Sequence, residues 1–405
     1  MAGDPLRITL VTPECGAGSR YQPMLQQVAH HLRTSGHQVS VAAVRRDVAL
    51  PELLNRVPSR QLERSGAQFL SHLAQLTVFR RLDVSRADVV ISTLPPSQAV
   101  QHDRHLALFF HHDRPFYDLS DLTISSGAAP DGELHRELAS LIRAADQPGL
   151  KGVTRFSVPS RSVQHRLHEY NQIDQVLPFS VGVSSHLDEP DINTADGREH
   201  VLCVGPHELA QRTELFVQAA HLVPDIPAIS VGDGSRFEWV QRVDRGLDRV
   251  STVEPEKLWR RPPDGALPIP SLQGEPLVRF IPWARRADLD RLCREARCLV
   301  APAIDEDYGF PVLDAMAWGV PAIACTDGGG LAEMIEVTGC GLVVAPEPRA
   351  IAEAVRKLGN DTDLAAQCRA AGLAAVEHRY TWERTFDQLD FALAAVMDAP
   401  RPPTT

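Results

Sequence analysis

The sequence has 405 residues, of which 43% are hydrophobic and 23% charged, a profile typical of a globular protein. This length exceeds a single ordinary core and fits two domains of roughly 150–200 residues each. A formal net charge of −11, with no dense basic tract, argues against a nucleic-acid partner and against firm docking on an anionic membrane. No window reaches the ~18 consecutive apolar residues of a membrane span, and the N-terminus lacks the pattern of a secretory signal.

The seven cysteines are irregularly spaced and form no CxxC pair, which argues against a zinc ribbon or a redox motif. We expect reduced, buried thiols in a cytoplasmic protein. His111-His112-Asp113 has metal-binding residue types, but adjacent side chains rarely converge on one ion. We therefore expect no metal site.

The first half of the chain alternates short apolar runs with helical periodicity. Residues 7–11 form an apolar run, and a turn containing Gly16 and Gly18 follows it. Pro23 suits the first turn of a helix that ends near Gly36. Further strands are expected at 39–44, 88–92 and 107–110. This alternation predicts a doubly wound parallel sheet.

A polar stretch over residues 181–200 predicts a linker, after which the pattern restarts. Strands are expected at 200–204, 228–231, 278–281 and 298–301, with helices between them. A proline-rich surface loop is expected over 261–276. The fold class is therefore α/β, with Rossmann-like domains over residues 1–185 and 186–378.

The segment 301–330 carries the most specific chemistry. A strand ends near Ala301, three acids at 305–307 follow, and a helix begins near Pro311 and ends at Gly319. The amino end of a helix presents free backbone N–H groups and a positive dipole, which suit a phosphate. Carboxylates beside it can accept hydrogen bonds from sugar and ribose hydroxyls. Together these features predict a nucleotide-sugar pocket, although Glu306 alone would also suit electrostatic support of the helix start.

This stretch resembles the Glu-x7-Glu region of retaining family 4 glycosyltransferases, which have the GT-B fold. Glu306 matches the first acid, which in that family contacts donor-sugar hydroxyls. Asp314 stands where the second is usually Glu and holds the ribose. The resemblance implies two Rossmann-like domains facing each other across a cleft, and a C-terminal helix, within residues 379–405, that returns to the first domain. The tail over residues 399–405 is expected to be disordered.

The resemblance extends to other segments and implies further site residues. The glycine turn resembles the loop that approaches the donor diphosphate, and Phe109 to Asp113 resembles the strand end whose histidine lies near the donor sugar. We favour His111 over His112 by position. Residues 280–283 resemble the border of the base pocket, and residues 380–383 the last-helix signature. The donor-binding residues expected are Gly16, Gly18, Gly205, Trp283, Tyr308, Gly309, Phe310, Pro311 and Asp314.

The sequence departs from the family pattern where cations usually neutralise the leaving diphosphate. The expected Arg and Lys positions hold Pro206 and Gln211, which carry no charge. Arg212 is adjacent and is a candidate replacement, with a solvated helix-start arginine as the alternative; Arg20 is a second candidate. We take His111, Glu306 and Arg212 as the candidate catalytic residues.

These observations predict transfer of a sugar from a nucleotide-sugar donor to a hydroxyl-bearing acceptor with retention of configuration. The resemblance implies no metal and no cofactor beyond the donor. One alternative is a catalytically degenerate homologue that binds nucleotide and acts as a partner. Another is different GT-B chemistry, such as a sugar epimerase or a pseudo-glycosyl coupling enzyme. The sequence does not identify the base and sugar of the donor, the acceptor or the oligomeric state.

Overall fold

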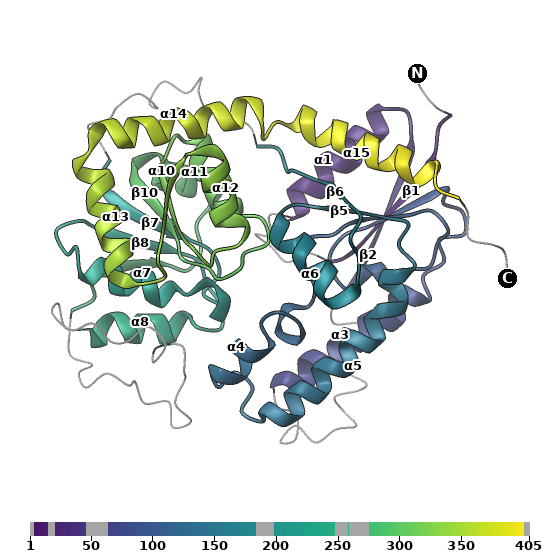
Figure 1. Cartoon of the computed structure of the whole chain (residues 1–405), viewed down its shortest axis with the longest axis horizontal. Helices are drawn as coiled ribbons and strands as arrows, with labels where there is room; N and C mark the ends of the chain where they lie inside the picture. The colour runs from purple at the N-terminus through teal and green to yellow at the C-terminus, as the bar shows by residue number, and fades with distance from the viewer. Residues whose placement is uncertain are drawn as a thin grey trace. The chain divides into compact units, whose positions relative to one another are not determined.

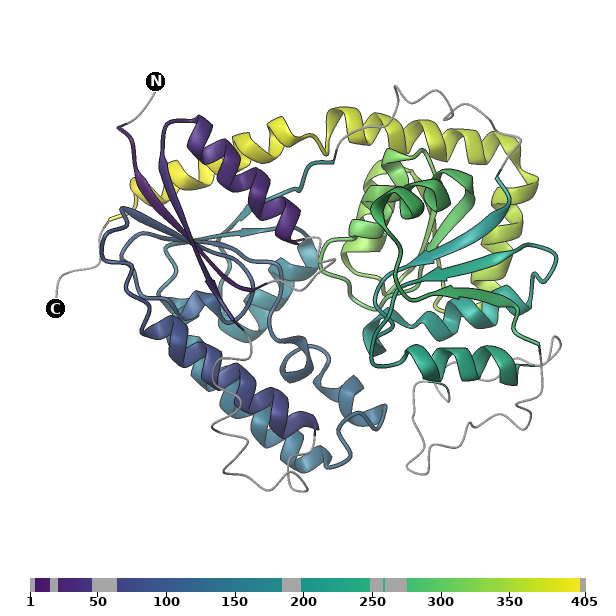
Figure 2. The same cartoon turned by 180° about the vertical axis from the view of Figure 1, so that it is seen from behind.

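The computed structural model describes residues 4–14, 21–45, 64–183, 198–247, 258 and 275–400. The chain divides into two compact units, Met1–Val181 together with Glu383–Thr405, and Gly182–Trp382. Each unit contains one sheet with helices on both of its faces (Figures 1 and 2). Gly16, Gly18 and Arg20 lie outside the described residues, as does most of the proline-rich stretch 261–276.

The first unit is built on a six-stranded sheet in which every pairing is parallel. Its strands, in spatial order, are β2 (Gln38–Val44), β1 (Arg7–Pro13), β3 (Val89–Ser92), β4 (His105–Leu108), β5 (Arg155–Val158) and β6 (Val176–Pro178). Its helices are α1 (Tyr21–Thr34), α3 (Arg64–Arg80), α4 (Ser120–Ser125), α5 (Gly132–Lys151), α6 (Arg161–Asn171) and α15 (Trp382–Met397), with short 3-10 turns η1 (Ser97–Ala99) and η2 (Arg114–Phe116).

The strand predicted over 107–110 begins earlier, at His105, and ends at Leu108. A polar residue can start this buried strand because the His105 ring bonds Ser92 Oγ of the neighbouring strand at 2.7 Å. Phe109 and Phe110 follow the strand and are fully buried in aromatic contacts with Phe156 and Phe179. Their apolar character reflects packing after the strand end rather than strand pairing.

The second unit also contains a six-stranded, all-parallel sheet. Its strands, in spatial order, are β9 (Val278–Ile281), β8 (Ala228–Val231), β7 (His200–Val204), β10 (Ala296–Ala301), β11 (Ala322–Cys325) and β12 (Gly341–Val344). Its helices are α7 (Thr213–His221), α8 (Phe237–Gly246), α10 (Arg286–Glu295), α11 (Phe310–Ala317), α12 (Gly330–Thr338), α13 (Pro348–Asn360) and α14 (Thr362–His378), with a 3-10 turn η4 (Leu209–Gln211).

The strand order of the second sheet reverses between β7 and β10. From β7 the chain builds outward to β8 and β9, and then returns to β10 on the other side. In open α/β sheets such a switch point leaves a crevice at the carboxyl ends of the two central strands, where ligands bind. The topology therefore directs attention to the segments that follow Val204 and Ala301.

The cysteines among the described residues are free and buried. Cys203, Cys298 and Cys325 belong to the core of the second unit, with Val201, Val300 and Ile323. Burial raises the pKa of Cys203 and of Cys298 to about 12, so these groups are neutral thiols at physiological pH. They act as small apolar residues of the core, as the sequence predicts.

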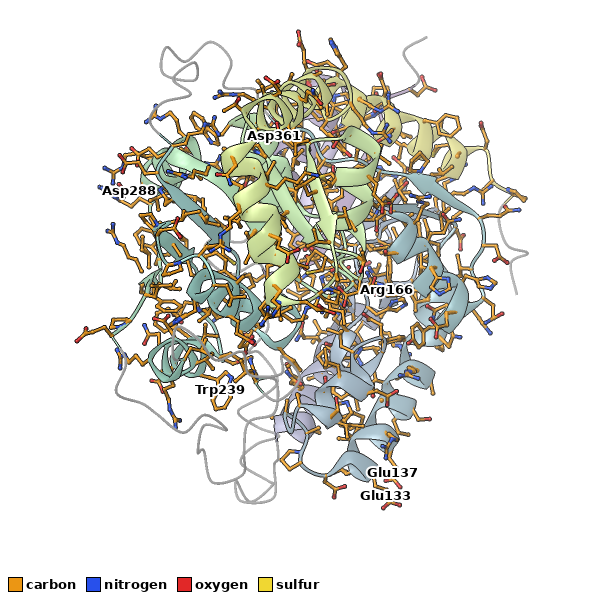
Figure 3. The ribbon with its side chains drawn as sticks, turned by 60° about the vertical axis from the view of Figure 1, so that its left-hand side comes forward. Glu133, Glu137, Arg166, Trp239, Asp288 and Asp361 are labelled. Atoms are coloured by element: carbon orange, nitrogen blue, oxygen red, sulfur yellow. The ribbon has the colours of Figure 1, made fainter. Side chains whose placement is uncertain are left out.

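A local signal fixes the boundary between α13 and α14. Asp361 ends α13 and caps α14, because its side chain accepts the Leu364 N–H at 2.9 Å (Figure 3). The chain passes from the first unit to the second between Val181 and Gly182, and returns to the first between Trp382 and Glu383. A Cβ on Gly182 would lie 2.6 Å from Trp382 N, so the two crossing segments touch. In the first unit α15 packs on α1, where His31 stacks on Phe386 and bonds Asp390 at 2.9 Å.

Candidate functional site

Two loops of the second unit meet at the switch point of its sheet. One runs from Gly205 to Arg212 after β7, and the other from Pro302 to Gly309 after β10. The Ile304 N–H donates to the Ala210 carbonyl at 2.8 Å, which joins them. The fold thus brings Glu306 next to the loop that carries Gly205 and Arg212, although Glu306 lies far from this loop in the sequence.

The acid loop lies directly against the three glycines that follow β11. The Asp305 N–H donates to the Asp327 carbonyl at 2.7 Å, and the Glu306 N–H to the Gly328 carbonyl at 3.1 Å. In return, the Gly330 N–H donates to the Glu306 carbonyl at 2.7 Å. A Cβ on Gly329 would lie 2.7 Å from the carbonyl carbon of Asp305. These glycines are therefore required for the backbone approach that fixes the position of Glu306.

Gly329→Ala is expected to destabilise the protein by about 3 kcal/mol, because it adds a backbone clash to an unfavourable positive φ. Gly36→Ala is the matched control, since Gly36 also has a positive φ (+94°) but has open space around its Cβ position. It is expected to cost about 1 kcal/mol. Denaturant unfolding of both variants measures the difference. Equal losses would contradict the role of close packing at Gly329.

Glu306 is bonded by a neutral donor at the position where the resemblance led us to expect a cation. The Gln211 side-chain amide donates to Glu306 Oε2 at 2.9 Å. An amide restrains the carboxylate but does not neutralise it, whereas a lysine would do both. This contact keeps the negative charge of Glu306 at the carboxyl edge of the sheet.

Arg212 is buried, with 1% of its surface exposed, and its guanidinium is bound within the second unit. Its Nη1 and Nη2 atoms bond the two carboxylate oxygens of Asp327 at 2.7 and 2.6 Å. Its Nε atom donates to the Pro302 carbonyl at 2.7 Å, and Nη2 to the Ala303 carbonyl at 3.3 Å. These contacts join the loop after β7, the start of the acid loop and the glycine turn. The side chain is not the solvated helix-start arginine considered from the sequence.

Helix α11 begins as the sequence predicts. Gly309 is its N-cap, with φ +102°, and Pro311 occupies the first turn, where its missing N–H costs no hydrogen bond. Tyr308 is 3% exposed and packs edge-on against Phe310, with their ring centres 5.2 Å apart. These contacts orient the amino end of α11 next to the acid loop.

Asp314 lies one turn into α11 and is mostly buried. Its carboxylate lies 3.9 Å from Nη2 of Arg286 on α10, and Arg286 also bonds Asp290 at 2.9 Å. Burial lowers the pKa of Arg286, but the charges of Asp314 and Asp290 outweigh this and raise it. Asp314 is therefore a carboxylate with a cationic neighbour, in a position to accept hydrogen bonds from hydroxyl groups.

Trp283 lies on the surface of the second unit, with 70% of its side chain exposed. It follows the edge strand β9, whose last carbonyl, at Ile281, accepts the Gly232 N–H at 2.9 Å. The indole is therefore near the carboxyl end of the sheet but outside its core. A large exposed aromatic side chain at a sheet edge is suited to stacking on a planar ligand.

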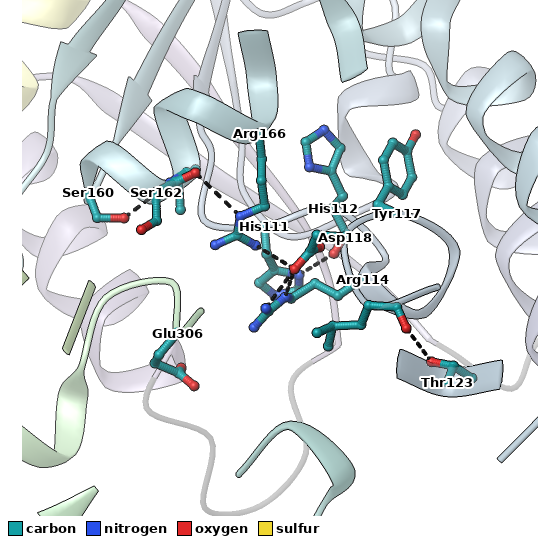
Figure 4. Close-up of polar contacts among 12 residues, drawn as sticks. His111, His112, Arg114, Tyr117, Asp118, Thr123, Ser160, Ser162, Arg166 and Glu306 are labelled. Carbon is teal, nitrogen blue, oxygen red and sulfur yellow. Dashed lines mark hydrogen bonds and ion pairs between the residues drawn. The ribbon is translucent and has the colours of Figure 1, made fainter. Parts of the chain in front are cut away.

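In the first unit, His111 and His112 differ sharply in environment (Figure 4). His112 is 2% exposed, stacks on Tyr117 at 4.2 Å and bonds Asn171 Oδ1 at 2.7 Å. Burial lowers the pKa of His112 to about 4, so its ring is neutral and belongs to the core. His111 is half-buried, and its Nδ1 bonds the His112 carbonyl at 2.7 Å. Of the two, His111 is the one with solvent access.

Two features, one in each unit, were not predicted from the sequence. One is Asp327, whose carboxylate holds Arg212; its place immediately before the three glycines was the available signal. The other is a cluster in the first unit in which Arg114 bonds Asp118 at 2.6 Å and Arg166 approaches the same oxygen at 3.7 Å (Figure 4). Among the described residues, no group of three or more His, Cys, Asp or Glu side chains is arranged to hold a metal ion.

Solved structures of glycosyltransferases share the fold of this chain. A sucrose-phosphate synthase structure from Thermosynechococcus elongatus matches 98% of this chain and 100% of its own, with a TM-score of 0.68 and 17% identity. Anabaena HepE in complex with UDP-glucose matches 96% of this chain and 100% of its own, with a TM-score of 0.61 and 15% identity. The chain thus has the two-unit α/β GT-B fold of glycosyltransferases, as the sequence predicts.

The family resemblance is carried by the second unit. Residues 269–374 match the family described as glycosyl transferases group 1. A D-inositol 3-phosphate glycosyltransferase from Nocardioides sp. is 32% identical over 28% of this chain and 24% of its own length. A probable sucrose-phosphate synthase from Solanum tuberosum is 37% identical over 24% of this chain and 9% of its own length. The chain therefore matches less than a quarter of the length of these relatives, and the matched segment contains the acid loop and α11.

In the part of the chain that the structure describes, no helix combines the length and the apolar character needed to cross a membrane.

Proposed function

We propose that this protein is a retaining glycosyltransferase that moves a sugar from a nucleotide-sugar donor to a hydroxyl-bearing acceptor. The observation that carries the proposal is the placement of Glu306 and Asp314 at the start of α11, at the carboxyl edge where the strand order of the second sheet reverses. The match of residues 269–374 to glycosyl transferases group 1 supports it.

In the proposed mechanism the backbone N–H groups at the start of α11 bind the donor phosphate. Glu306 accepts hydrogen bonds from donor-sugar hydroxyls, and Asp314 accepts them from the ribose. The exposed Trp283 borders the base, and His111 contacts the donor sugar. The acceptor hydroxyl attacks the anomeric carbon on the face that the diphosphate leaves, and the departing phosphate takes the acceptor proton. No metal and no protein nucleophile takes part.

Arg212 acts in this proposal by holding the loop that carries Glu306. Its bonds to Asp327, Pro302 and Ala303 fix the start of the acid loop. The role as a direct contact to the leaving diphosphate, considered from the sequence, is therefore replaced by a positioning role. Arg20 stays a candidate for the direct contact.

Binding of nucleoside diphosphates is the experiment that tests the donor site. Wild type is expected to show a rise in Tm with one of UDP, GDP, ADP and TDP, and Asp314→Ala is expected to lose this rise. The reason is that the substitution removes the proposed ribose acceptor. UDP is tested first, because solved neighbours of the same fold hold UDP or UDP-glucose.

The control is Asp361→Ala, which removes a carboxylate of the same unit from the start of α14, away from the proposed site. It is expected to lower Tm while leaving the nucleotide-induced rise unchanged. A rise that persists in Asp314→Ala would remove that residue from the site. Hydrolysis or transfer of the matching nucleotide sugar then tests for an enzyme, with phosphorylated and unphosphorylated polyols in the acceptor panel.

A second candidate function is a nucleotide-binding partner without turnover. The neutral residues Pro206 and Gln211, and the bond from Gln211 to Glu306, favour it, because the developing negative charge of a leaving diphosphate needs cationic or dipolar stabilisation. Detectable donor hydrolysis would exclude it. Other GT-B chemistry, such as epimerisation or pseudo-glycosyl coupling, is separated from transfer by product analysis.

A further inference from the structure

A buried histidine in the first unit bonds carboxylates from two other segments. His72 lies in the middle of α3, and 2% of its side chain is exposed. Its Nδ1 atom lies 2.9 Å from Asp113 Oδ2, in the segment after β4. Its Nε2 atom lies 2.7 Å from Asp146 Oδ1 on α5. One imidazole ring therefore joins three segments of the unit.

Both contacts require a donor on the ring. An ionised carboxylate only accepts hydrogen bonds, whereas a neutral imidazole carries a single N–H. A ring that donates from both nitrogens is an imidazolium. Burial would lower the pKa of His72, but the hydrogen bonds to Asp113 and Asp146, together with their charges, outweigh it and raise this pKa to about 10.

The groups around the two carboxylates support this charge state. The Tyr117 hydroxyl donates to Asp146 Oδ2 at 2.8 Å, and burial raises the pKa of Tyr117, so the phenol is neutral. His112 stacks on Tyr117 and is neutral as well. Arg143 of α5 lies 5.6 Å from the centre of the Tyr117 ring and supplies a second positive charge. The guanidinium donates to the Phe116 carbonyl at 2.7 Å and therefore lies beside the phenol that bonds Asp146.

We propose that His72 is a positioning residue for His111: it fixes Asp113 and thereby the segment that carries His111. The His111 ring bonds the His112 carbonyl, so its orientation follows the backbone between these residues and Asp113. The assignment of His111 to the donor sugar rests on the proposed function. The charge of His72 and its hydrogen bonds to Asp113 and Asp146 are independent of that function.

The first test does not depend on enzymatic turnover. In the full chain with ¹⁵N-labelled histidine, the His72 ring is expected to carry protons on both nitrogens at pH 8, and its signal is identified by its absence from His72→Gln. Because the folded pKa is raised above the unfolded value of 6.5, the stabilisation is complete below pH 6.5 and is lost as pH rises to about 10. Over this range the free energy of unfolding is therefore expected to fall more steeply with pH in wild type than in His72→Gln. The difference in slope corresponds to the release of one proton.

The control is His105→Gln, which removes a histidine that is also fully buried in the first unit. His105 bonds Ser92 Oγ, and burial lowers its pKa to about 3, so its ring is neutral. This variant is expected to lower stability without changing the loss between pH 6.5 and 10. A neutral His72 ring at pH 8, or an unchanged pH slope in His72→Gln, would overturn the assignment.

The second test measures whether the loss of His72 changes the environment of the His111 ring. Its ring resonances are expected to shift in His72→Gln and in Asp113→Ala, and to stay unchanged in His105→Gln. The kcat of donor turnover is expected to fall about 10-fold in either of the first two variants, with little change in KM. The double variant is expected to be no slower than either single one, because both remove the same contact.

Failure of this inference and failure of the proposed function have different signatures. Unchanged His111 resonances in His72→Gln would overturn the positioning role, whatever the activity. Additive kcat losses in the double variant would also overturn it. Absence of turnover in wild type, together with a shifted His111 resonance in His72→Gln, would support the positioning role and count against a transferase.

Discussion

Arg212→Ala is expected to lower the free energy of unfolding by about 3 kcal/mol and to abolish the Tm rise caused by a nucleotide. The substitution leaves the carbonyls of Pro302 and Ala303 and the Asp327 carboxylate without the donors that Arg212 supplies. The expected loss is at the lower end of the range for buried pairs, because the Asp327 side chain is 37% exposed and can regain water. Denaturant unfolding at neutral pH measures the change.

The matched control is Arg285→Ala, which removes another arginine–aspartate pair of the second unit. The Arg285 side chain is 73% exposed and bonds Asp288 at 2.8 Å, so water screens the pair and its loss is expected to change stability far less than the loss of Arg212. Arg212→Lys is expected to recover less than half of the loss, since one ammonium cannot reproduce the bidentate contact and the bonds to the carbonyls. Equal stability of Arg212→Ala and Arg285→Ala would contradict a clamp at Arg212.

Glu306→Gln is expected to lower kcat/KM for donor turnover by about 100-fold or more while the fold stays intact. The acid loop is held by the backbone bonds of Glu306 to Gly328 and Gly330, and the substitution leaves them in place. The replacement amide can still accept the Gln211 hydrogen bond through its oxygen. What is lost is the negative charge that would bind the sugar hydroxyls. Steady-state kinetics and Tm, measured on the same preparation, separate the two effects.

Glu336→Gln is the control for this prediction. Glu336 is an exposed residue of α12 in the same unit, and its loss of charge is expected to leave kcat/KM within about two-fold of wild type. Equal kinetics of Glu306→Gln and wild type would remove Glu306 from the chemistry. A fall in Tm as large as that of Gly329→Ala would instead assign it a structural role.

Much of the fold could be predicted from the sequence because its signals are local. The apolar runs of the parallel strands and the helical periodicity between them depend on neighbouring residues only. The start of α11 is local as well, since Gly309 and Pro311 set the backbone before any tertiary contact forms. The same applies to the expectation that the cysteines are buried thiols. The start of β4 at His105, two residues before the predicted start, could not be predicted from local signals. It depends on a hydrogen bond to Ser92 of another strand.

The candidate site depends on contacts between distant residues. The sequence by itself determined the parallel α/β alternation and the acid-loop segment, with Glu306 and Asp314 beside a helix start. Only the tertiary structure decided that Arg212 is a buried clamp on Asp327, that His112 belongs to the core while His111 has solvent access, and that the glycines at 328–330 must approach the acid loop closely. The reason is physical: burial and hydrogen-bond partners arise when segments far apart in the sequence pack together, as Arg212 and Asp327 do across 115 residues, and no local pattern encodes which charged side chain the packing will enclose.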